Sequence, residues 1–401
     1  MIDLTELLSK HLNITQGDPE LTPVVEAVGR RLASSYDAPE HVPAFRVSSV
    51  DGFAVRSADV AGSSPAKPSE LLLVDEIAAG QEGKELNSGE AAPIMTGAPV
   101  PAGADTCVMV EDSDIAGDLV HIQVQVPEGA YIREVGSAIT QGQLVVESNT
   151  VLTPAGAASL QSLGVTEVLV HPKTKVAIAS TGLELVAPDE VPTGAQIRDV
   201  NRTLLRELLE ASDCEVVDLG IVPDDQDSVL ALIERAKDNG ASAVISTGGV
   251  SMGRHDYVKA LAMEPDNNLG WYQVAIKPAK PLVFGEISDI AYFGLPGNPV
   301  SALVSFTLIV RTYLDRSRGI DGSKSITAEL RSATSKNSDD KVHYRAGRLD
   351  FDGGLIVELF GEDSSHQINS YATANCLVEL GEPRDYVVGE QVRVHKFGSG
   401  L

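Results

Sequence analysis

Two glycine-rich segments, each following a short apolar run, contain the residues best suited to bind a charged ligand. The first, Thr-Gly-Gly-Val-Ser-Met-Gly, spans residues 247–253, and the second, Gly-Leu-Pro-Gly-Asn-Pro-Val-Ser, spans residues 294–301. Glycine lets the backbone approach a ligand closely, and backbone amides at a helix start attract negative charge. Either segment alone could be a plain strand-to-helix turn, but the pair favours an anion-binding site. The candidate ligand-binding residues are Gly248, Gly249, Ser251, Pro296, Asn298, Pro299 and Ser301.

Three acidic residues near these segments offer a second kind of chemistry. Asp256 follows the first glycine-rich segment, and Asp224 and Asp225 follow an apolar run that ends at Pro223. Such residues are most often helix N-caps, but carboxylates grouped at one sheet edge also bind Mg²⁺ beside a phosphate. For each of the three residues, a helix cap and a metal ligand are therefore the two alternatives.

Other polar residues stand at the ends of apolar runs, where a catalytic group could be exposed. Glu184 follows Ser-Thr-Gly-Leu, and a solvated loop position is the alternative to a catalytic one. Asp51 precedes glycine in a strong turn signal, and Thr96 offers a hydroxyl in a loop rich in proline and glycine. Asn201 is expected to begin a helix as its cap.

The net charge of −26, from 31 Lys and Arg against 57 Asp and Glu, argues against nucleic acid or an anionic membrane surface as a general partner. Positive charge for an anionic ligand must therefore be local, because exposed charges are largely screened beyond about 8 Å. The main candidates are Lys277 and Lys280, in Ile-Lys-Pro-Ala-Lys-Pro. Arg254, Arg198 and Arg133 are further candidates.

The cysteines and the apolar stretches indicate a cytoplasmic protein. The three cysteines are far apart in apolar surroundings, which is typical of core residues in a reducing compartment. No His pair has the spacing of a zinc site. The N-terminal residues lack the pattern of a secretory leader, and the longest apolar stretch, residues 302–310, is shorter than the roughly 18 residues of a membrane span.

Alternating strands and helices are expected to position the two glycine-rich segments. This alternation is typical of a doubly wound, mostly parallel sheet with helices on both faces. Both segments would then leave the carboxyl edge of the sheet, where α/β proteins bind ligands. Strands are predicted at residues 176–180, 215–221, 243–247 and 290–293, and helices at residues 154–163, 201–211, 226–239 and 300–314.

The flanking sequence predicts three more domains in a multidomain α/β protein. Apolar residues have helical spacing in residues 1–39, with helix starts at Thr5 and at Thr22-Pro23. Short alternating runs predict an inserted small β domain, and similar runs after Gly319 predict a C-terminal β-barrel. The predicted boundaries are 1–40 plus 134–172 for an elongated helical and mixed domain, 41–133 for the β domain, 173–320 for the α/β ligand-binding domain and 321–401 for the barrel.

Several motifs, in this order along nearly the whole chain, resemble the molybdopterin molybdenumtransferase family of bacterial MoeA and the E domain of gephyrin. The matching motifs are Ser-Val-Asp-Gly-Phe-Ala-Val at 49–55, Ile-Met-Thr-Gly-Ala-Pro-Val-Pro at 94–101, Ser-Thr-Gly-Leu-Glu-Leu at 180–185, Gly-Gly-Val-Ser-Met-Gly-Arg-His-Asp-Tyr at 248–257, Lys-Pro-Ala-Lys-Pro at 277–281, Gly-Leu-Pro-Gly-Asn-Pro-Val-Ser at 294–301, Ser-His at 365–366 and Ala-Asn-Cys at 374–376.

The resemblance implies four domains, with the first interrupted by the second, in an elongated homodimer. It also implies a reaction in which molybdate is inserted into the dithiolene of adenylylated molybdopterin and AMP is released, with Mg²⁺ or another divalent cation. The site is expected between the α/β ligand-binding domain (173–320) of one subunit and the inserted β domain (41–133) of the other. Such a ligand is a polyanion, and it suits a site built from backbone amides, lysines and a bridging metal.

The resemblance also assigns expected roles to the candidate residues. Asp51 and Thr96 would help to place molybdate from the partner subunit. Glu184, Asp225 and Asp256 would serve the metal and phosphate side, and we expect Glu184 and Asp256 to be catalytic together with Asp51 and Thr96. The ligand would be held by Gly248, Gly249, Ser251, Lys277, Lys280 and the loop of Pro296, Asn298, Pro299 and Ser301.

The chain departs from the family pattern at several carboxylates. Ser137 and Ala138 stand where the family commonly has Glu and Asp, and Leu183 replaces the Asp of Ser-Thr-Gly-Asp-Glu-Leu. Alanine and leucine cannot bind metal or transfer protons. The alternative function is a gephyrin-like dimeric scaffold, with reduced or no transferase activity, that binds a membrane receptor or a tubulin-like division protein. That alternative depends on analogy between folds.

Overall fold

The computed structural model describes residues 1–74, 76–250, 258, 262, 268–320, 325–360 and 368–397. The chain forms two compact units, one from Met1–Glu20 and His171–Leu401 and the other from Leu21–Val170. The glycine-rich segments lie in the first unit, and Asp51 and Thr96 lie in the second. The four-domain boundaries are finer than this division and stay predictions.

A mixed six-stranded sheet forms the centre of the first unit. Its four predicted strands are parallel neighbours, and two strands that were not predicted extend one edge in antiparallel pairing. The sheet is therefore less uniformly parallel than the sequence indicated. The strand order is β16 (Cys214–Val222), β13 (Thr174–Thr181), β17 (Ala243–Thr247), β21 (Ile290–Leu295), β20 (Pro281–Ile287) and β18 (Asn268–Gln273).

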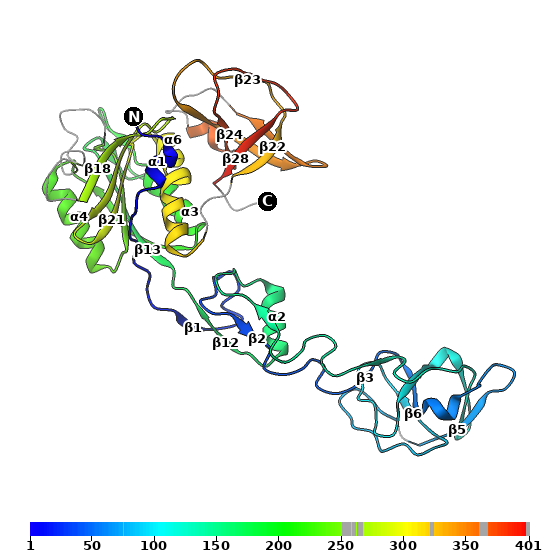
Figure 1. Ribbon diagram of the computed structural model, residues 1–401. Coiled ribbons are helices and arrows are strands. Elements are labelled where there is room, and N and C mark those ends of the chain that lie inside the picture. The colour runs from blue at the N-terminus through cyan, green and yellow to red at the C-terminus, as the bar shows by residue number, and fades with distance from the viewer. Residues whose placement is uncertain are drawn as a thin grey trace. The chain divides into compact units, whose positions relative to one another are not determined.

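Helices cover both faces of this sheet, as Figure 1 shows for α3 (Asn201–Glu210) and α4 (Gln226–Asp238). Alternate residues of a strand point to opposite faces. In β13, Ile178 packs in the core that includes Leu205 of α3, whereas Ala177 packs in the core that includes Leu232 of α4. The helices predicted at 201–211 and 226–239 are confirmed.

The helix predicted at 300–314 is confirmed but is interrupted in its middle. It consists of α6 (Pro299–Ser305), a π-helical turn η3 (Phe306–Val310) and α7 (Arg311–Ser317). Nearly every residue of α6 and η3 is buried, and these segments pack on the same face as α3. Asn298 is the N-cap of α6, so the second glycine-rich segment leads directly into a buried helix.

The second predicted N-terminal helix is wrong. The first, α1 (Leu4–Leu8), is present and buries Leu7. Further along, the chain forms β1 (Glu20–Pro23), turns, and β2 (Tyr36–Asp37) instead. The N–H groups of Val24 and Leu32 donate to the carbonyl oxygens of Thr166 and Thr150 rather than along a helix. Apolar spacing was therefore misleading, because these side chains pack against a distant segment.

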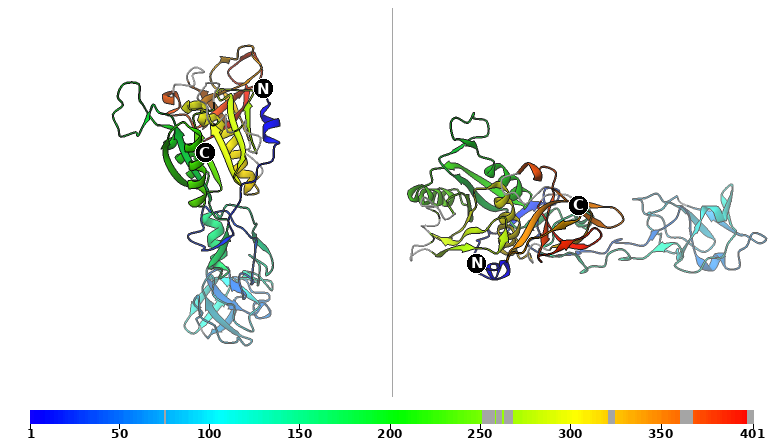
Figure 2. Two further views of the ribbon diagram at one scale, coloured as in Figure 1. Left: turned by 90° about the vertical axis from the view of Figure 1, so that its left-hand side faces the viewer. Right: turned by 90° about the horizontal axis from the view of Figure 1, so that it is seen from above.

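The predicted C-terminal β-barrel is confirmed. Five strands close on one another around a core that includes Leu349, Val378 and Val394. In both views of Figure 2 the orange-to-red strands of this barrel lie beside the central sheet, and β19 (Ile276–Lys277) pairs with barrel strand β24. The strands are β22 (Ile326–Leu330), β24 (Val342–Phe351), β25 (Leu355–Leu359), β26 (Cys376–Leu380) and β28 (Gln391–Lys396), with β23 (Thr334–Ser335), β27 (Asp385–Tyr386) and η4 (Ile368–Tyr371) between them.

The second unit contains a six-stranded sheet, several two-stranded pairs and the helix α2 (Pro154–Ser162), which was predicted. Thr153 caps this helix by accepting a hydrogen bond from the N–H of Gly156 at 3.0 Å. The sheet has the order β7 (Thr106–Met109), β4 (Gly52–Val55), β6 (Glu90–Ile94), β5 (Ser69–Leu73), β9 (Leu119–Ile122) and β8 (Ser113–Ala116). The remaining elements are η1 (Ser57–Val60), η2 (Val110–Asp112), β3 (Val47–Ser48), β10 (Ile132–Arg133), β11 (Leu144–Val146) and β12 (Glu167–Val170).

Candidate functional site

A cavity of about 500 Å³ lies at the carboxyl ends of β13, β17 and β21 in the first unit. This volume is within the usual range for a small-molecule site. The end of each of these parallel strands contributes to the wall, which is where open α/β sheets bind ligands. The wall includes Thr181, Thr247, Gly248, Gly249, Pro296 and Asn298.

The two glycine-rich segments meet at this cavity. The N–H of Gly248 donates to the carbonyl oxygen of Leu295 at 3.0 Å. A Cβ atom on Gly297 would lie only 3.7 Å from the Cα of Gly248. Of the predicted ligand-binding residues, the structure brings together Gly248, Gly249, Pro296, Asn298 and Ser301 on one wall. Ligand binding by these residues stays a prediction.

Gly248 and Gly249 occupy backbone positions that other residues rarely adopt. Their φ angles are 104° and 66°. A Cβ on Gly248 would lie 2.5 Å from both the carbonyl oxygen and Oγ1 of Thr181, and a Cβ on Gly249 would lie 2.9 Å from Oδ1 of Asp224. The segment therefore needs glycine both for its conformation and for its contact with the end of β13.

We expect Gly248→Ala to lower the free energy of unfolding by about 1–3 kcal/mol, since the new Cβ is strained and collides with backbone. Gly194→Ala is the matched control, because Gly194 has a φ of 61° and no atom within 4 Å of an added Cβ. Gly194→Ala therefore loses stability only through the unfavourable backbone conformation, without a steric clash. Chemical unfolding of both variants measures the difference, and equal losses would contradict a tight contact at Gly248.

Two carboxylates, those of Glu184 and Asp224, line the cavity. Glu184 lies in the turn between β13 and the short strand β14 (Leu185–Val186), which pairs with β15 (Ile197–Arg198). Its carboxylate lies against Gly182, since a Cβ there would be 2.7 Å from Oε2 of Glu184. Leu183, beside it, is 83% exposed. The predicted residue Glu184 is therefore at the cavity, and Asp224 joins it from the end of β16.

Asp225 is the N-cap of α4 and does not line the described part of the cavity wall. Its Oδ1 accepts the N–H of Ser228 at 2.8 Å, and its Oδ2 accepts the Ser228 hydroxyl at 2.7 Å. These two hydrogen bonds, the backbone one first, lower the pKa of Asp225. Metal binding by Asp225 stays a prediction, and its contacts fit the helix-cap alternative.

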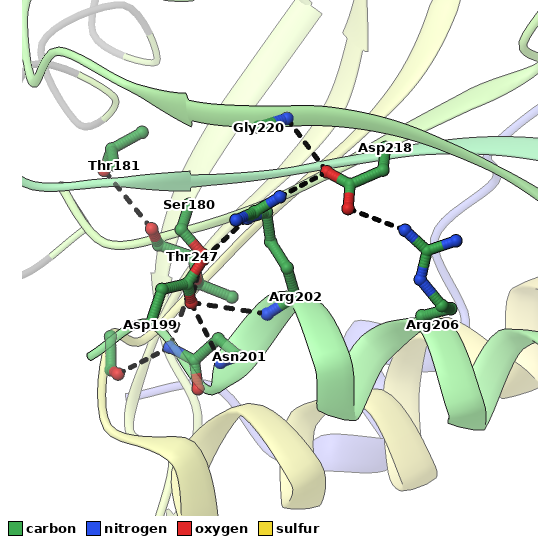
Figure 3. A network of polar contacts seen from close by, with 10 residues as sticks. Ser180, Thr181, Asp199, Asn201, Arg202, Arg206, Asp218, Gly220 and Thr247 are labelled. Atoms are coloured by element: carbon green, nitrogen blue, oxygen red, sulfur yellow. Dashed lines mark hydrogen bonds and ion pairs between the residues drawn. The ribbon is translucent and has the colours of Figure 1, made fainter. Parts of the chain in front are cut away.

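Asn201, which lines the cavity, and Asp199, which hydrogen-bonds to it, were not identified from the sequence as parts of the site. Figure 3 shows Asp199 among Ser180, Asn201 and Arg202, and its side chain is buried. Asn201 lines the cavity and is the first residue of α3, with Val200 at the N-cap position, so the predicted cap role of Asn201 is wrong. The sequence did place Asp199 two positions before a predicted helix start, but an acidic residue there is ordinarily explained by helix capping alone.

The two predicted lysines are not among the described wall residues of the cavity. Lys277 lies in β19, opposite His343 of the barrel. The carbonyl oxygen of Lys280 accepts the N–H of Val274 at 2.7 Å, and its neighbour Pro281 does line the cavity. Pro299 occupies the first turn of α6. The predicted residues Ser251, Arg254 and Asp256 lie outside the described residues.

Asp51 and Thr96 lie together in the second unit, although 45 positions separate them. The N–H of Thr96 donates to Oδ1 of Asp51 at 2.6 Å. This backbone hydrogen bond, followed by one from the Thr96 side chain, lowers the pKa of Asp51. The carboxylate is therefore ionised and exposed beside a threonine, and its predicted catalytic role stays a prediction.

The three cysteines are buried and form no disulfide. Burial raises the pKa of Cys214 to about 11. Across the residues that the structure describes, no three His, Cys, Asp or Glu side chains form a group that could hold a metal ion. None of the described helices has the length and apolar character that crossing a membrane requires.

Three family descriptions match successive parts of the chain. They are the MoeA N-terminal region (domain I and II) over residues 2–164, the "Probable molybdopterin binding domain" over residues 177–316, and the MoeA C-terminal region (domain IV) over residues 327–397. The chain belongs to the MoeA family. The resemblance in the sequence motifs is therefore confirmed over the full length.

Relatives of known name support this family membership. The chain is 34% identical over 384 residues to the molybdopterin molybdenumtransferase of Haemophilus influenzae, covering 93% of this chain and 92% of that protein. It is 32% identical over 386 residues to molybdopterin molybdenumtransferase 2 of Mycobacterium tuberculosis, covering 94% of each. A crystal structure of the molybdopterin biosynthesis MoeA protein from Pyrococcus horikoshii matches with a TM-score of 0.84 at 28% identity, over 99% of this chain and 100% of that one.

Proposed function

We propose that this chain is a molybdopterin molybdenumtransferase of molybdenum cofactor biosynthesis. Its reaction is the insertion of molybdate into adenylylated molybdopterin, with release of AMP. Relatives that carry the transferase name align with almost the whole chain. The observation that carries the proposal is the convergence of the Gly248 and Gly297 segments on one cavity that also contains Glu184 and Asp224.

The cavity suits a nucleotide-linked pterin in both size and polarity. Adenylylated molybdopterin carries several phosphate charges, and its backbone partners would be the amides that follow β17 and β21. The N–H of Gly248 already donates to Leu295, but the absence of a side chain at Gly249 and Gly297 would let the ligand approach the backbone there closely. Apolar wall residues, among them Leu185 and Val250, would contact the rings of the ligand.

A divalent cation such as Mg²⁺ fits the charges of the wall. Glu184 and Asp224 are carboxylates, no Lys or Arg is among the described wall residues, and the ligand is itself anionic. Oxygen ligands of this kind are those that Mg²⁺ prefers. We propose Asp224 and Glu184 as its protein ligands, with Asp256 as predicted from the sequence. When bound, the metal would neutralise the phosphate charge and polarise the bond to AMP.

Asp51 and Thr96 are proposed to place molybdate. Their mutual hydrogen bond holds an ionised carboxylate beside a hydroxyl and a turn, which is suited to orienting an oxyanion through its protons or a bridging cation. Because the two residues belong to the second unit, we propose a homodimer in which the second unit of one copy completes the cavity of the other. A receptor or tubulin-like partner stays a prediction.

Complementation tests the proposed function. The gene would be expressed in a bacterium that lacks its own molybdenumtransferase, and nitrate reductase would report molybdenum cofactor synthesis. We expect rescue at moderate expression, with the empty vector as the lower limit. Absence of rescue by folded, well-expressed protein would reject the transferase assignment. Assay of AMP released by purified protein then checks the reaction directly.

A further inference from the structure

The carboxamide of Asn201 connects the two loops that line the cavity. Its Nδ2 donates to the carbonyl oxygen of Gly297 at 2.7 Å and to Oγ1 of Thr247 at 3.3 Å. Gly297 belongs to the second glycine-rich segment, and Thr247 immediately precedes Gly248 in the first. A side chain from a third element, α3, therefore contributes to the spacing between the two loops.

The donor end of this carboxamide, rather than its oxygen, makes the useful contacts. A backbone carbonyl can only accept a hydrogen bond, so the atom that faces Gly297 must be Nδ2. Among the described residues, Oδ1 of Asn201 is buried and has no hydrogen-bond partner. An aspartate would suit the start of a helix equally well, but its carboxylate could not donate to Gly297.

Asp199 holds Asn201 in this orientation through an ordered chain of hydrogen bonds. The Asp199 carboxylate is 2% exposed and can only accept, so Ser180 donates its hydroxyl to Oδ1 at 2.9 Å. The Ser180 oxygen is then the acceptor for the Thr247 hydroxyl at 3.1 Å, and Thr247 in turn accepts from Asn201. Asp199 also accepts the backbone N–H of Asn201 at 3.0 Å.

Arg202 of α3 balances the buried charge of Asp199 (Figure 3). The Nε of Arg202 lies 2.6 Å from Oδ2 of Asp199, and its Nη1 lies 2.7 Å from Asp218. Arg206 binds the other oxygen of Asp218 at 2.7 Å. A buried carboxylate is costly unless it is paired in this way. If the contacts of Asp199 served only to cap α3, replacing the Nδ2 amide of Asn201 by an oxygen would leave ligand binding unchanged.

We propose that Asn201 is a positioning residue of the cavity, which sets the separation of the Gly248 and Gly297 loops, and that Asp199 keeps its carboxamide in the donating orientation. In this role Asn201 acts on the ligand through its hydrogen bonds to these loops. This inference rests on the proposed function for the identity of the ligand, the nucleotide-linked pterin, but not for the positioning of the loops.

Three variants of the full chain test the proposal: Asn201→Asp, Asn201→Ala and the control Arg206→Ala. Arg206 lies on the same helix and loses only a partly exposed ion pair. We expect Asn201→Asp to raise the KM for adenylylated molybdopterin and the Kd for AMP by about 10-fold, with kcat within about threefold of wild type. The isosteric variant is expected to be worse than Asn201→Ala, because its carboxylate faces the Gly297 carbonyl. If Asn201 contributed only packing, Asn201→Ala would instead be the more severe of the two variants.

The pH dependence of Asn201→Asp provides a signature that a merely structural role lacks. Burial raises the pKa of a carboxyl group, and the protonated form can donate to Gly297 as the amide does. Its AMP affinity relative to wild type is therefore expected to recover as the pH falls from about 8 to about 5. Asn201→Ala and Arg206→Ala should keep a constant ratio to wild type. A constant ratio for Asn201→Asp would overturn the proposal.

Hydrogen exchange in the absence of ligand separates this inference from the proposed function. We expect peptides that contain residues 247–250 and 295–298 to exchange faster in both Asn201 variants than in wild type, and to be unchanged in Arg206→Ala. Unchanged exchange in both Asn201 variants would overturn the positioning role. Wild-type protein that neither binds AMP nor converts adenylylated molybdopterin would reject the proposed function. The exchange data would still decide the positioning role of Asn201. If Asn201→Asp does not fold, Asn201→Ala against its control decides it.

Discussion

Replacing Asp224 by alanine is expected to lower the rate of molybdate insertion on the order of 100-fold while the fold is retained. Asp224 lines the cavity beside Gly249, and Glu184 is the other carboxylate among the described wall residues. Loss of a residue that only orients a metal ligand already lowers metal affinity or activity about 10- to 100-fold, so loss of a direct ligand is expected at the upper end of that range. The Mg²⁺ concentration that gives half the maximal rate should rise with the loss of turnover. Steady-state release of AMP at several Mg²⁺ concentrations measures both quantities.

Asp225→Ala is the matched comparison for Asp224→Ala, because it removes the neighbouring carboxylate. Asp225 is engaged by the N–H and hydroxyl of Ser228 at the start of α4. We expect this variant to melt at a lower temperature but to keep its turnover, since it loses a helix cap. If Asp224→Ala has normal turnover and folded Asp225→Ala has lost it, the metal ligand is Asp225, as the sequence predicted, and Asp224 is not.

The pattern of apolar runs was sufficient to predict the strands and loops that form the cavity. β17 and β21 are short, apolar and fully buried, and each is followed by glycine or proline. Parallel strands bring their carboxyl ends to one edge of the sheet. The sequence alone therefore predicts that the Gly248 and Gly297 loops are neighbours. The hydrogen bond from the N–H of Gly248 to the carbonyl oxygen of Leu295, at 3.0 Å, agrees with that reasoning. This part of the site depends on local pattern and a general rule of topology.

The antiparallel edge of the sheet could not be predicted from the same pattern. β18 has the sequence Asn-Leu-Gly-Trp-Tyr-Gln and only one buried residue, Leu269. Its place in the sheet comes from pairing with β20, which lies between it and β21. The N-terminal segment around Val24 failed for a related reason, because it bonds to residues near 150 and 166. Long-range pairing overrides local propensity in both cases.

The choice between neighbouring carboxylates was also beyond the sequence. Asp224 and Asp225 both follow Pro223, and either could cap α4. The backbone at Asp225 is extended, as in most N-cap residues, so its side chain turns back to Ser228 and leaves Asp224 at the cavity. Asp199 was missed because a charged residue is normally exposed, and only its contacts with Arg202 and Ser180 explain its burial.

Arg318→Met is expected to lower the free energy of unfolding of the first unit by about 3–5 kcal/mol, since it breaks a buried ion pair. Arg318 is 7% exposed at the end of α7, and its Nη2 lies 2.9 Å from Oδ1 of Asp315. Its Nη1 also donates to the carbonyl oxygen of Ser212 at 2.6 Å, in the turn between α3 and β16. Methionine has a similar length but leaves Asp315 and this carbonyl without their buried donor.

Arg316→Met on the same helix is the control for Arg318→Met. Arg316 is exposed, contacts the carbonyl oxygen of Leu8 and lies 5.7 Å from the centre of the Tyr313 ring, so its replacement should cost about 0–1 kcal/mol. Urea unfolding followed by the fluorescence of Trp271, the single tryptophan, reports on this unit. Equal losses in the two variants would show that length and packing, rather than the buried charge, account for the effect. A large loss confined to Arg318→Met would mean that the turn before β16 depends on the Arg318 guanidinium. Since β16 leads to Asp224, a residue far from the cavity would then stabilise the strand that positions a cavity carboxylate.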